Sequence, residues 1–447
     1  MDNAQTIVDI VAFVSSILLG EDGRANHTAS PAIHYGRLEE APAEAKLVVL
    51  PSGFLHSVLQ GKGGWVPELP LADHEGLPVF FGNPGVESRG GRVVLQVDVI
   101  ATVFFLLTRY EEILRPDTRD QHGRFPGRDS LMGRADLASR PIVDEYGALV
   151  RELLRATGLD IPEPPCELRR VFLTHDMDAP LVWHRMRPVL GEFRRRMLRG
   201  DLRSALRPVL AYAGLQRSDP NDCFDWISSR ARELQERLGE EKVHLLCFVM
   251  AGATCPQDGN YEVGSRLIRK LMQSLMEDGA ELGLHASYEA GIHPELIGNE
   301  AQLLREVSGA QIVSNRHHYL CWRNLEDYRA ILAAGIERDF TMAFPDLAGF
   351  RLGTCRSFFW FDPVAMKSTE LKIFPTAVME CSLDRKNNMN LCYEEALAAC
   401  TSLIEATRRY NGDLTLLWHN TELTLASEAR GSYQRKLYTR LLTDILS

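Results

Sequence analysis

The regular alternation of apolar and amphipathic segments after residue 168 constrains the fold of this chain more than any other feature. Short apolar runs are typical of buried strands, and most of them are followed by a stretch with helical periodicity. The strand candidates are 169–176, 242–250, 280–285, 312–317, 338–344, 370–376 and 413–419, and the helix candidates are 224–238, 262–278, 299–307, 324–334, 392–410 and 432–446. The alternation predicts an α/β fold with a parallel sheet, and about seven repeats favour a (β/α)7-type barrel, closed or nearly so.

The N-terminal part follows a different pattern and predicts a smaller α/β domain. Strands are expected at 45–51, 77–82 and 91–98, and helices at 7–20, 99–114 and 141–157. The proline-rich segment 161–167 reads as a linker, because proline cannot sit inside a helix. With 447 residues, two domains are the natural expectation. We place an accessory domain at 1–160 and the barrel at 168–447.

Composition excludes several classes of protein. The chain is 45% hydrophobic and 25% charged with a net charge of −10, which argues against nucleic-acid binding. Its nine cysteines are scattered without a CxxC pair, so we expect neither a disulfide framework nor a zinc knuckle. The apolar stretch 7–20 carries Asp9 and is too short to span a bilayer. We therefore predict a cytoplasmic protein without an export signal.

Two acidic residues stand at the end of the first strand of the barrel. Asp176 and Asp178 follow the apolar run VFLTH, and side chains two residues apart on a strand point to the same face. Two adjacent like charges repel, so either one carboxyl is protonated or a cation lies between them. The pair predicts a metal site or an acid/base pair; a solvated turn is the alternative.

Imidazoles stand at the ends of other predicted strands: His285, the neighbours His317 and His318, and His419. In a barrel the carboxyl ends of the strands form one face, where catalytic groups gather. One carboxylate and two imidazoles form a common open site for zinc or a similar divalent ion. The residue types therefore fit a site with Asp178, His285 and His318 as ligands, Asp176 as general base and His419 as general acid. Arg351, between two glycines, is expected to hold a carboxylate by bidentate pairing.

Five motifs in this order, THDMD, GLHASY, RHHYL, GFRLGT and LLWHN, resemble the polysaccharide deacetylase superfamily (carbohydrate esterase family 4), in a divergent bacterial branch. The resemblance covers roughly residues 168–447. Segments RYEE (109–112), DQHGRF (120–125) and RPIVDEY (140–146) resemble the uncharacterised domain that precedes the deacetylase-like domain in that branch. The resemblance implies a distorted (β/α) barrel, a divalent metal and hydrolysis of an N-acetyl group from an amino sugar.

The motifs of this chain depart from the family pattern at two places. The family has adjacent aspartates as base and ligand, whereas Met177 separates the two here. The family also has two histidines four residues apart, and here Glu289 occupies the second position. The resemblance implies that the missing imidazole comes from RHHYL, where His318 matches better than His317. It also implies that Arg351 is the arginine of the third motif and that His419 is the acid.

The segment 184–208 is the one strongly basic region, with eight arginines against Glu192 and Asp201. A solvated helix face is the simpler interpretation. The alternative is a docking surface for an anionic substrate or for lipid headgroups.

Together these features predict a metal-dependent C–N hydrolase, a deacetylase of an N-acetylated sugar or glycan precursor, with zinc as the expected metal. Two alternatives stay open, an amide hydrolase with a non-sugar substrate and a metal-free binding or scaffold subunit on the same barrel. The N-terminal domain fits a lid, a glycan-binding module or a dimerisation element equally well.

Overall fold

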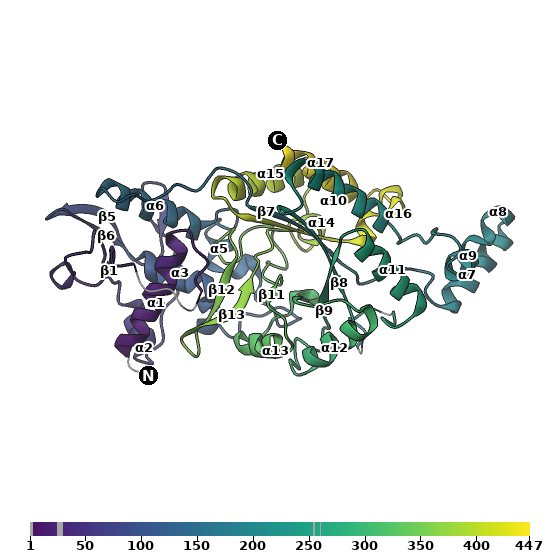
Figure 1. The fold of residues 1–447 in the computed structure, drawn as a ribbon, viewed down its shortest axis with the longest axis horizontal. Coiled ribbons are helices and arrows are strands. Elements are labelled where there is room, and N and C mark those ends of the chain that lie inside the picture. The colour runs from purple at the N-terminus through teal and green to yellow at the C-terminus, as the bar shows by residue number, and fades with distance from the viewer. Residues whose placement is uncertain (1–2, 25–29, 254, 260) are drawn as a thin grey trace.

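The computed structural model describes residues 3–24, 30–253, 255–259 and 261–447, and it shows a mixed α/β protein built on two main sheets (Figure 1). Within these residues the larger sheet has nine strands and the smaller has four. Every neighbouring pair in the larger sheet except one is parallel. The predicted α/β class with a parallel sheet is therefore confirmed.

The larger sheet contains the seven predicted strands and two further ones at its edges. In spatial order they are β12 (Phe358–Asp362), β13 (Lys367–Ile373), β11 (Arg338–Asp339), β10 (Ser314–His317), β9 (Glu281–Ala286), β8 (Val243–Val249), β7 (Arg170–Asp176), β15 (Asp413–His419) and β14 (Val378–Met379). The edge strand β12 is antiparallel to β13. The sequence pattern predicts neither β12 nor the two-residue β14.

This sheet curves strongly around an aromatic interior. The rings of Phe172 on β7 and Phe374 after β13 have centroids 5.0 Å apart. Five strand spacings separate β7 from β13 in the sheet order, and in a flat sheet these would hold the rings about 24 Å apart. Leu246, Phe248 and Phe340 complete this small inner core. The two edges, β12 and β14, are not paired with each other among the described residues.

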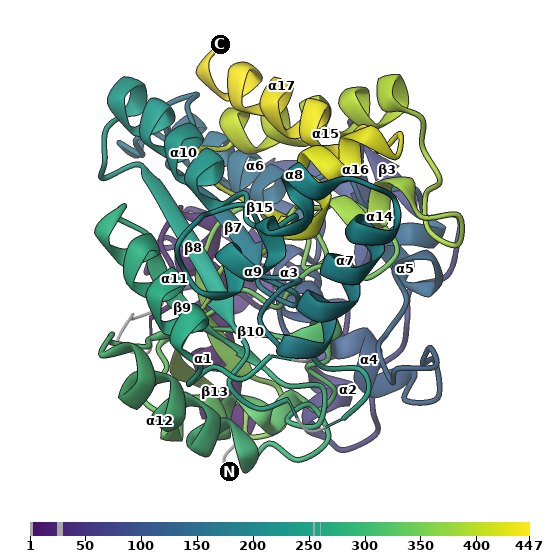
Figure 2. The same cartoon turned by 90° about the vertical axis from the view of Figure 1, so that its right-hand side faces the viewer.

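Helices cover the outer face of the sheet (Figure 2). They are α10 (Phe224–Leu238), α11 (Arg266–Glu277), α12 (Leu296–Ser308), α13 (Tyr328–Ala333), α15 (Tyr393–Arg409) and α17 (Gln434–Leu446), and the short α14 (Glu380–Asp384) and α16 (Leu425–Ala429) follow β14 and β15 in the chain. His175 on β7 points outward, where its Nε2 lies 3.2 Å from the hydroxyl of Tyr438 on α17. None of the described helices has the length and apolarity needed to cross a membrane.

The N-terminal part has a sheet of its own. Strands β1 (Ile33–Tyr35), β2 (Leu47–Val49) and β6 (Arg92–Val97) are parallel, and β5 (Gly82–Arg89) is antiparallel to β6. The other elements include the hairpin β3 (Ala72–His74) and β4 (Leu77–Val79) and the α-helices α1 (Asn3–Leu18), α2 (Phe54–Leu59), α3 (Val99–Leu107), α4 (Tyr110–Leu114), α5 (Leu131–Arg134) and α6 (Ile142–Ala156). Buried side chains of this part are continuous with the core around the larger sheet. The predicted division into domains at residues 160–168 stays a prediction.

Two predicted elements are shorter than the sequence pattern indicates. The helix expected over 99–114 is interrupted at Arg109, whose left-handed backbone (φ 55°) separates α3 from α4. The strand expected over 338–344 keeps only two residues in the ladder. The carboxylate of Asp339 accepts the backbone N–H of Thr341 at 2.8 Å, and this local turn ends the strand.

A buried ion cluster joins α4 to the chain that follows β11. Glu112 accepts hydrogen bonds from Arg109 and Arg351, each at 2.8 Å, and all three side chains are buried. Burial raises the pKa of Glu112, but the two guanidinium groups, Arg109 foremost, outweigh it and lower the pKa to about 2. The cluster therefore keeps a carboxylate charged between two buried cations, and Arg119, 3.3 Å away, is its third ion-pair partner.

We expect Glu112→Gln to lower the free energy of unfolding by about 3–5 kcal/mol, because it leaves two buried cations without a counter-charge. Glu163→Gln, which removes the exposed partner of Arg155, is the matched control and should cost less than about 1 kcal/mol. Urea unfolding at neutral pH measures both variants. In the wild type the contribution of the Glu112 carboxylate to the free energy of unfolding is fully present above its usual pKa of 4.5. It is lost as the pH falls toward 2 and the carboxylate takes up a proton. Equal effects of the two variants would contradict this account of the cluster.

Candidate metal centre

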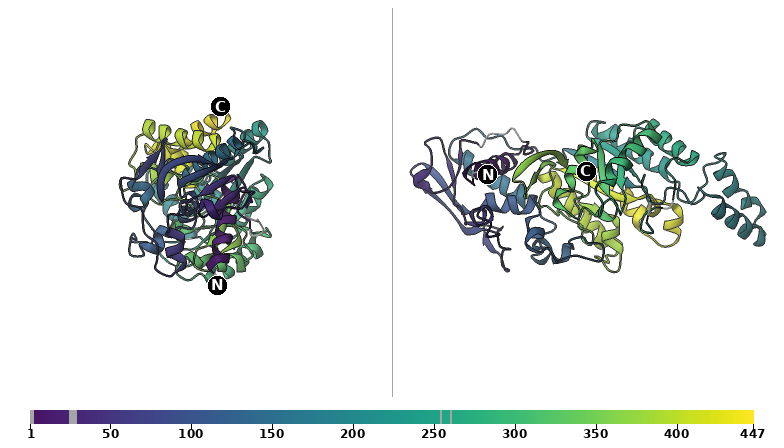
Figure 3. Two further views of the ribbon diagram at one scale, coloured as in Figure 1. Left: turned by 90° about the vertical axis from the view of Figure 1, so that its left-hand side faces the viewer. Right: turned by 90° about the horizontal axis from the view of Figure 1, so that it is seen from below.

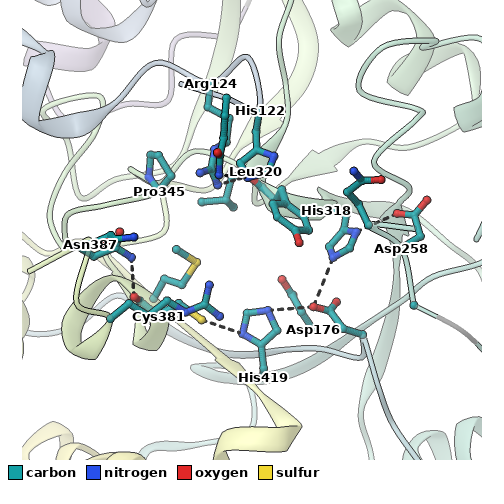
Figure 4. Close-up of a pocket in the computed structure, with 18 of the residues that line it drawn as sticks. His122, Arg124, Asp176, Asp258, His318, Leu320, Pro345, Cys381, Asn387 and His419 are labelled. Atoms are coloured by element: carbon teal, nitrogen blue, oxygen red, sulfur yellow. Dashed lines mark hydrogen bonds and ion pairs between the residues drawn. The ribbon is translucent and has the colours of Figure 1, made fainter. Parts of the chain in front are cut away.

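The carboxyl ends of the central strands open into one cavity of about 650 Å³ (Figure 4). Asp176 is the last residue of β7, and His419, the last residue of β15, lies opposite it in the register. His285 lies on β9 and His318 follows β10 directly. The parallel ladder therefore brings residues from four strand ends to one place, together with Asp178 just beyond β7.

The carboxylate of Asp178 is the point on which three imidazoles converge. Its Oδ1 lies 3.1 Å from Nε2 of His285, and its Oδ2 lies 3.4 Å from Nε2 of His318 and 3.4 Å from Nε2 of His419. Figure 4 shows His318 and His419 approaching the same corner of the cavity, beside Asp176. One ligand atom from each of Asp178, His285 and His318 lies within 4.8 Å of the others. The structure thus brings the predicted ligand set together.

The two predicted imidazole ligands are each held by their other ring nitrogen. Nδ1 of His285 donates to the carbonyl oxygen of Arg316 at 2.9 Å. Nδ1 of His318 donates to Oδ1 of Asp258 at 2.9 Å. Such outer hydrogen bonds fix the orientation and the tautomer of a metal-binding imidazole. Both Nε2 atoms are consequently directed at Asp178.

The surroundings of Asp178 fit a cation. Its Oδ1 and Nε2 of His285 are buried and face each other, yet neither has a hydrogen-bond partner of suitable geometry among the described residues. Burial lowers the pKa of His318, but Asp178 and Asp258 outweigh it and raise the pKa to about 9. The negative charge that holds a proton on His318 also attracts a divalent ion. One carboxylate with two imidazoles is the donor set of an open metal site.

His419 has a different outer partner from the two predicted ligands. Its Nδ1 is hydrogen-bonded to the buried carboxylate of Glu380, and Sγ of Cys381 lies 3.8 Å from the same nitrogen. Burial lowers the pKa of His419, but Glu380, Cys381 and Asp178 raise it well above the usual value. Glu380, Cys381 and His419 also form a second group that is able to hold a metal ion. The raised pKa favours His419 as a proton donor at the cavity wall.

Asp176 is paired with an arginine that the sequence pattern does not single out. Arg316 on β10 donates to Oδ1 of Asp176 at 2.8 Å, and both side chains are buried. The guanidinium group also lies 4.5 Å from the ring centre of Phe248 on the inner face of the sheet. Burial raises the pKa of Asp176, but neighbouring cations, Arg316 foremost, lower it overall. The other oxygen, Oδ2, lies 3.6 Å from Nε2 of His285.

Arg351 and His317 lie away from this group. Arg351 bonds Glu112 in the buried ion cluster, so the carboxylate that it holds is not one of those at the strand ends. It is absent from the described lining of the cavity. His317 is fully buried on β10, with Nδ1 3.0 Å from the side-chain nitrogen of Asn315. Of these two neighbouring histidines, His318 lines the cavity.

A loop of the N-terminal part forms another section of the cavity wall. Gln121, His122 and Arg124 line the cavity. The ring of His122 lies 4.8 Å from that of Tyr319, and Arg124 donates to the carbonyl oxygen of Tyr319 at 2.9 Å. Tyr319 has a left-handed backbone (φ 57°), a conformation that costs energy for a residue with a side chain. The sequence pattern does not place this loop at the site.

Comparison with known proteins adds the following likenesses. Residues 13–158 match DUF7033, a family of unknown function. A crystal structure from Mycobacterium smegmatis, provisionally described as that of a polysaccharide deacetylase, aligns with a TM-score of 0.37 and 13% identity. That alignment covers 63% of this chain and 86% of the other. No curated protein matches.

We expect Arg316→Gln to lower the free energy of unfolding by about 3–5 kcal/mol at neutral pH, because Asp176 is left buried as an unpaired charge. Without the guanidinium group the pKa of Asp176 rises, so the loss should shrink as the pH falls toward about 4 and the carboxyl takes up a proton. Urea unfolding as a function of pH measures this dependence. The control is Asp176→Asn/Arg316→Gln, which removes both charges and should recover part of the loss. A loss that is independent of pH and is not recovered in the double variant would contradict the pairing.

Proposed function

We propose that this protein is a metal-dependent hydrolase that removes an N-acetyl group from an amino sugar or a glycan precursor. The observation that carries the proposal is the convergence of three imidazole Nε2 atoms on Asp178, a residue that lines the cavity together with His318 and His419. Asp178, His285 and His318 would hold the ion and leave positions for water and substrate. Zn²⁺ suits two nitrogen ligands and one oxygen ligand. When bound, it supplies a Lewis acid that polarises the amide carbonyl and makes water more acidic.

Two further residues are placed for the proton transfers. Asp176 takes a proton from the attacking water through Oδ2, while Oδ1 stays bonded to Arg316. The water oxygen bonds to the acetyl carbon and the C–N bond breaks. Nε2 of His419, held by Glu380 through Nδ1, gives its proton to the departing amine nitrogen. The products are acetate and the free amino sugar.

The walls of the cavity support a polar substrate of sugar size. A volume of about 650 Å³ is in the usual range for small-molecule sites. Gln121, Arg124 and Asn387 line it with hydrogen-bonding groups, and Tyr319, which also lines it, is 37% exposed. Such groups suit the hydroxyls and the apolar face of a sugar ring. A cytoplasmic location, which the sequence predicts, favours a precursor or small glycoside over a finished wall polymer.

The scaffold that we propose for this chemistry is a distorted, incompletely closed (β/α) barrel. The contact between Phe172 and Phe374 across the inner face supports it, since a flat sheet would hold β7 and β13 far apart.

Purified wild-type protein should bind about one equivalent of zinc, and Asp178→Ala and His285→Ala should lose it, because each removes one of three proposed ligands. His293→Ala removes an exposed histidine and is the matched control. Elemental analysis after dialysis measures the content. A wild type that takes up no metal even on reconstitution would overturn the hydrolase proposal and favour a binding subunit on the same scaffold.

Acetate release from N-acetylated amino sugars tests the reaction itself. Asp176→Asn and His419→Gln should each lower kcat by about 10²–10⁴-fold, because each removes one proton transfer. Both variants should keep the metal, which separates loss of chemistry from loss of the site. His293→Gln should keep wild-type kcat. The metal-loaded wild type could release no acetate from any such sugar and yet hydrolyse another amide. That result would contradict a sugar substrate and favour a non-sugar amide.

A further inference from the structure

Residues 183–215 form an arm that extends from the body of the protein (Figures 1 and 3). Its helices are α7 (Met186–Leu198), α8 (Leu202–Ala205) and α9 (Arg207–Tyr212). The arm has only a small interior of its own, made by Trp183, Val189 and Ala211. Most of its surface therefore faces away from the rest of the chain.

The arm exposes an unusual number of apolar side chains. Met186 and Leu190 are four residues apart, and Met197 follows Leu190 by seven residues, so all three lie on one face of α7. Their exposed fractions are 51%, 54% and 43% in this order. Leu198 and Leu202, at and beyond the end of that helix, are 79% and 62% exposed. Exposed apolar side chains that occur singly need no explanation, but a concentration of them on one small element marks an interaction surface.

The same arm is strongly basic. Residues 184–208 hold eight arginines and two acidic residues, a surplus of six positive charges in a chain whose net charge is −10. Glu192 forms ion pairs with Arg195 at 2.9 Å and Arg196 at 2.7 Å. The arginines of this segment that form no ion pair with a described residue are Arg185, Arg187, Arg194, Arg199, Arg203 and Arg207. The charge of the arm is therefore largely uncompensated.

We propose that the arm docks on an anionic lipid surface, with its apolar side chains among the lipid headgroups and its arginines against the phosphates. A helix with leucine and methionine on one face and arginine around them binds lipid in this way. Each cation near such a surface adds to the attraction. A second copy of the arm fits less well, because two arms of the same charge repel each other. Nucleic acid would engage the arginines and leave the leucines exposed.

The base of the arm lies beside the cavity. Ala179 lines the cavity a few residues before the arm begins. Its carbonyl oxygen accepts hydrogen bonds from the side chains of Asn221 (2.9 Å) and Asn420 (3.2 Å), and Asn420 follows His419. The arm is therefore joined to the body of the protein at the cavity wall. The docking itself does not rest on the proposed function, since it is measured as binding.

Co-sedimentation of the full-length protein with vesicles tests the docking. Vesicles of phosphatidylglycerol and phosphatidylcholine should bind the wild type at least about tenfold more tightly than vesicles of phosphatidylcholine alone. Leu190→Ser/Leu198→Ser/Leu202→Ser and Arg194→Gln/Arg203→Gln should each weaken binding by at least about tenfold, the first through lost insertion and the second through lost attraction. High salt should weaken vesicle binding by the wild type to about the level of the arginine variant, because salt screens the attraction between the arginines and the phosphates.

A matched control sits on the body of the protein. Leu425→Ser/Arg430→Gln changes an exposed leucine and an exposed arginine outside the arm and should bind vesicles as the wild type does. Circular dichroism and metal content should be unchanged in all variants, so a failure of docking is separable from a failure of the metal site. Wild type that binds neither kind of vesicle overturns the proposal. The proposal is also overturned if the leucine variant binds vesicles as tightly as the wild type. It is overturned as well if the wild type forms a concentration-dependent dimer that the arm variants do not form.

Discussion

The parallel pairing of β7 with β15 on one side and β8 on the other is the constraint on which the site depends. β7 and β15 pair over seven residues, from Arg170 opposite Asp413 to Asp176 opposite His419. A slip of one residue would turn Asp176 from the inner face of the sheet to the outer face. Asp178 leaves the strand just beyond the last pair, so one ladder positions both carboxylates and the imidazole opposite them.

The two carboxylates at the end of β7 have partners of different chemistry. Asp176 is paired with the buried guanidinium group of Arg316 at 2.8 Å, so this carboxylate has a counter-charge supplied by the chain itself. Asp178 faces the imidazoles of His285 and His318, and imidazole is a side chain able to bind either a proton or a metal ion. The surroundings of Asp176 are therefore fixed, whereas those of Asp178 differ according to whether the imidazoles hold protons or a metal ion. This difference underlies the roles of base and ligand that we propose for them.

How far the site is predictable from sequence depends on how local its signals are. Asp178 and His285 are visible because each follows an apolar run, and the parallel sheet then brings strand ends together. Asp258 and Arg316 are not visible, because their partners lie 60 and 140 residues away in the chain. The glycine-flanked motif around Arg351 is also local, and it gives no sign that the buried Glu112, 239 residues earlier, is its partner. Likewise the fold class follows from periodicity, whereas β12, β14 and the N-terminal loop at the cavity depend on tertiary packing.

The place of β15 in the sheet has a consequence for biosynthesis. It comes after every other described strand in the chain, yet it lies between β7 and β14. His175 and Trp418, which pair across β7 and β15, are 243 residues apart. At about 5–20 residues per second, a ribosome needs roughly 10–50 s after synthesising β7 to synthesise its neighbour β15. During this interval one edge of β7 is unpaired and open to wrong partners. The candidate metal centre therefore cannot assemble in the nascent protein until β15 has been synthesised.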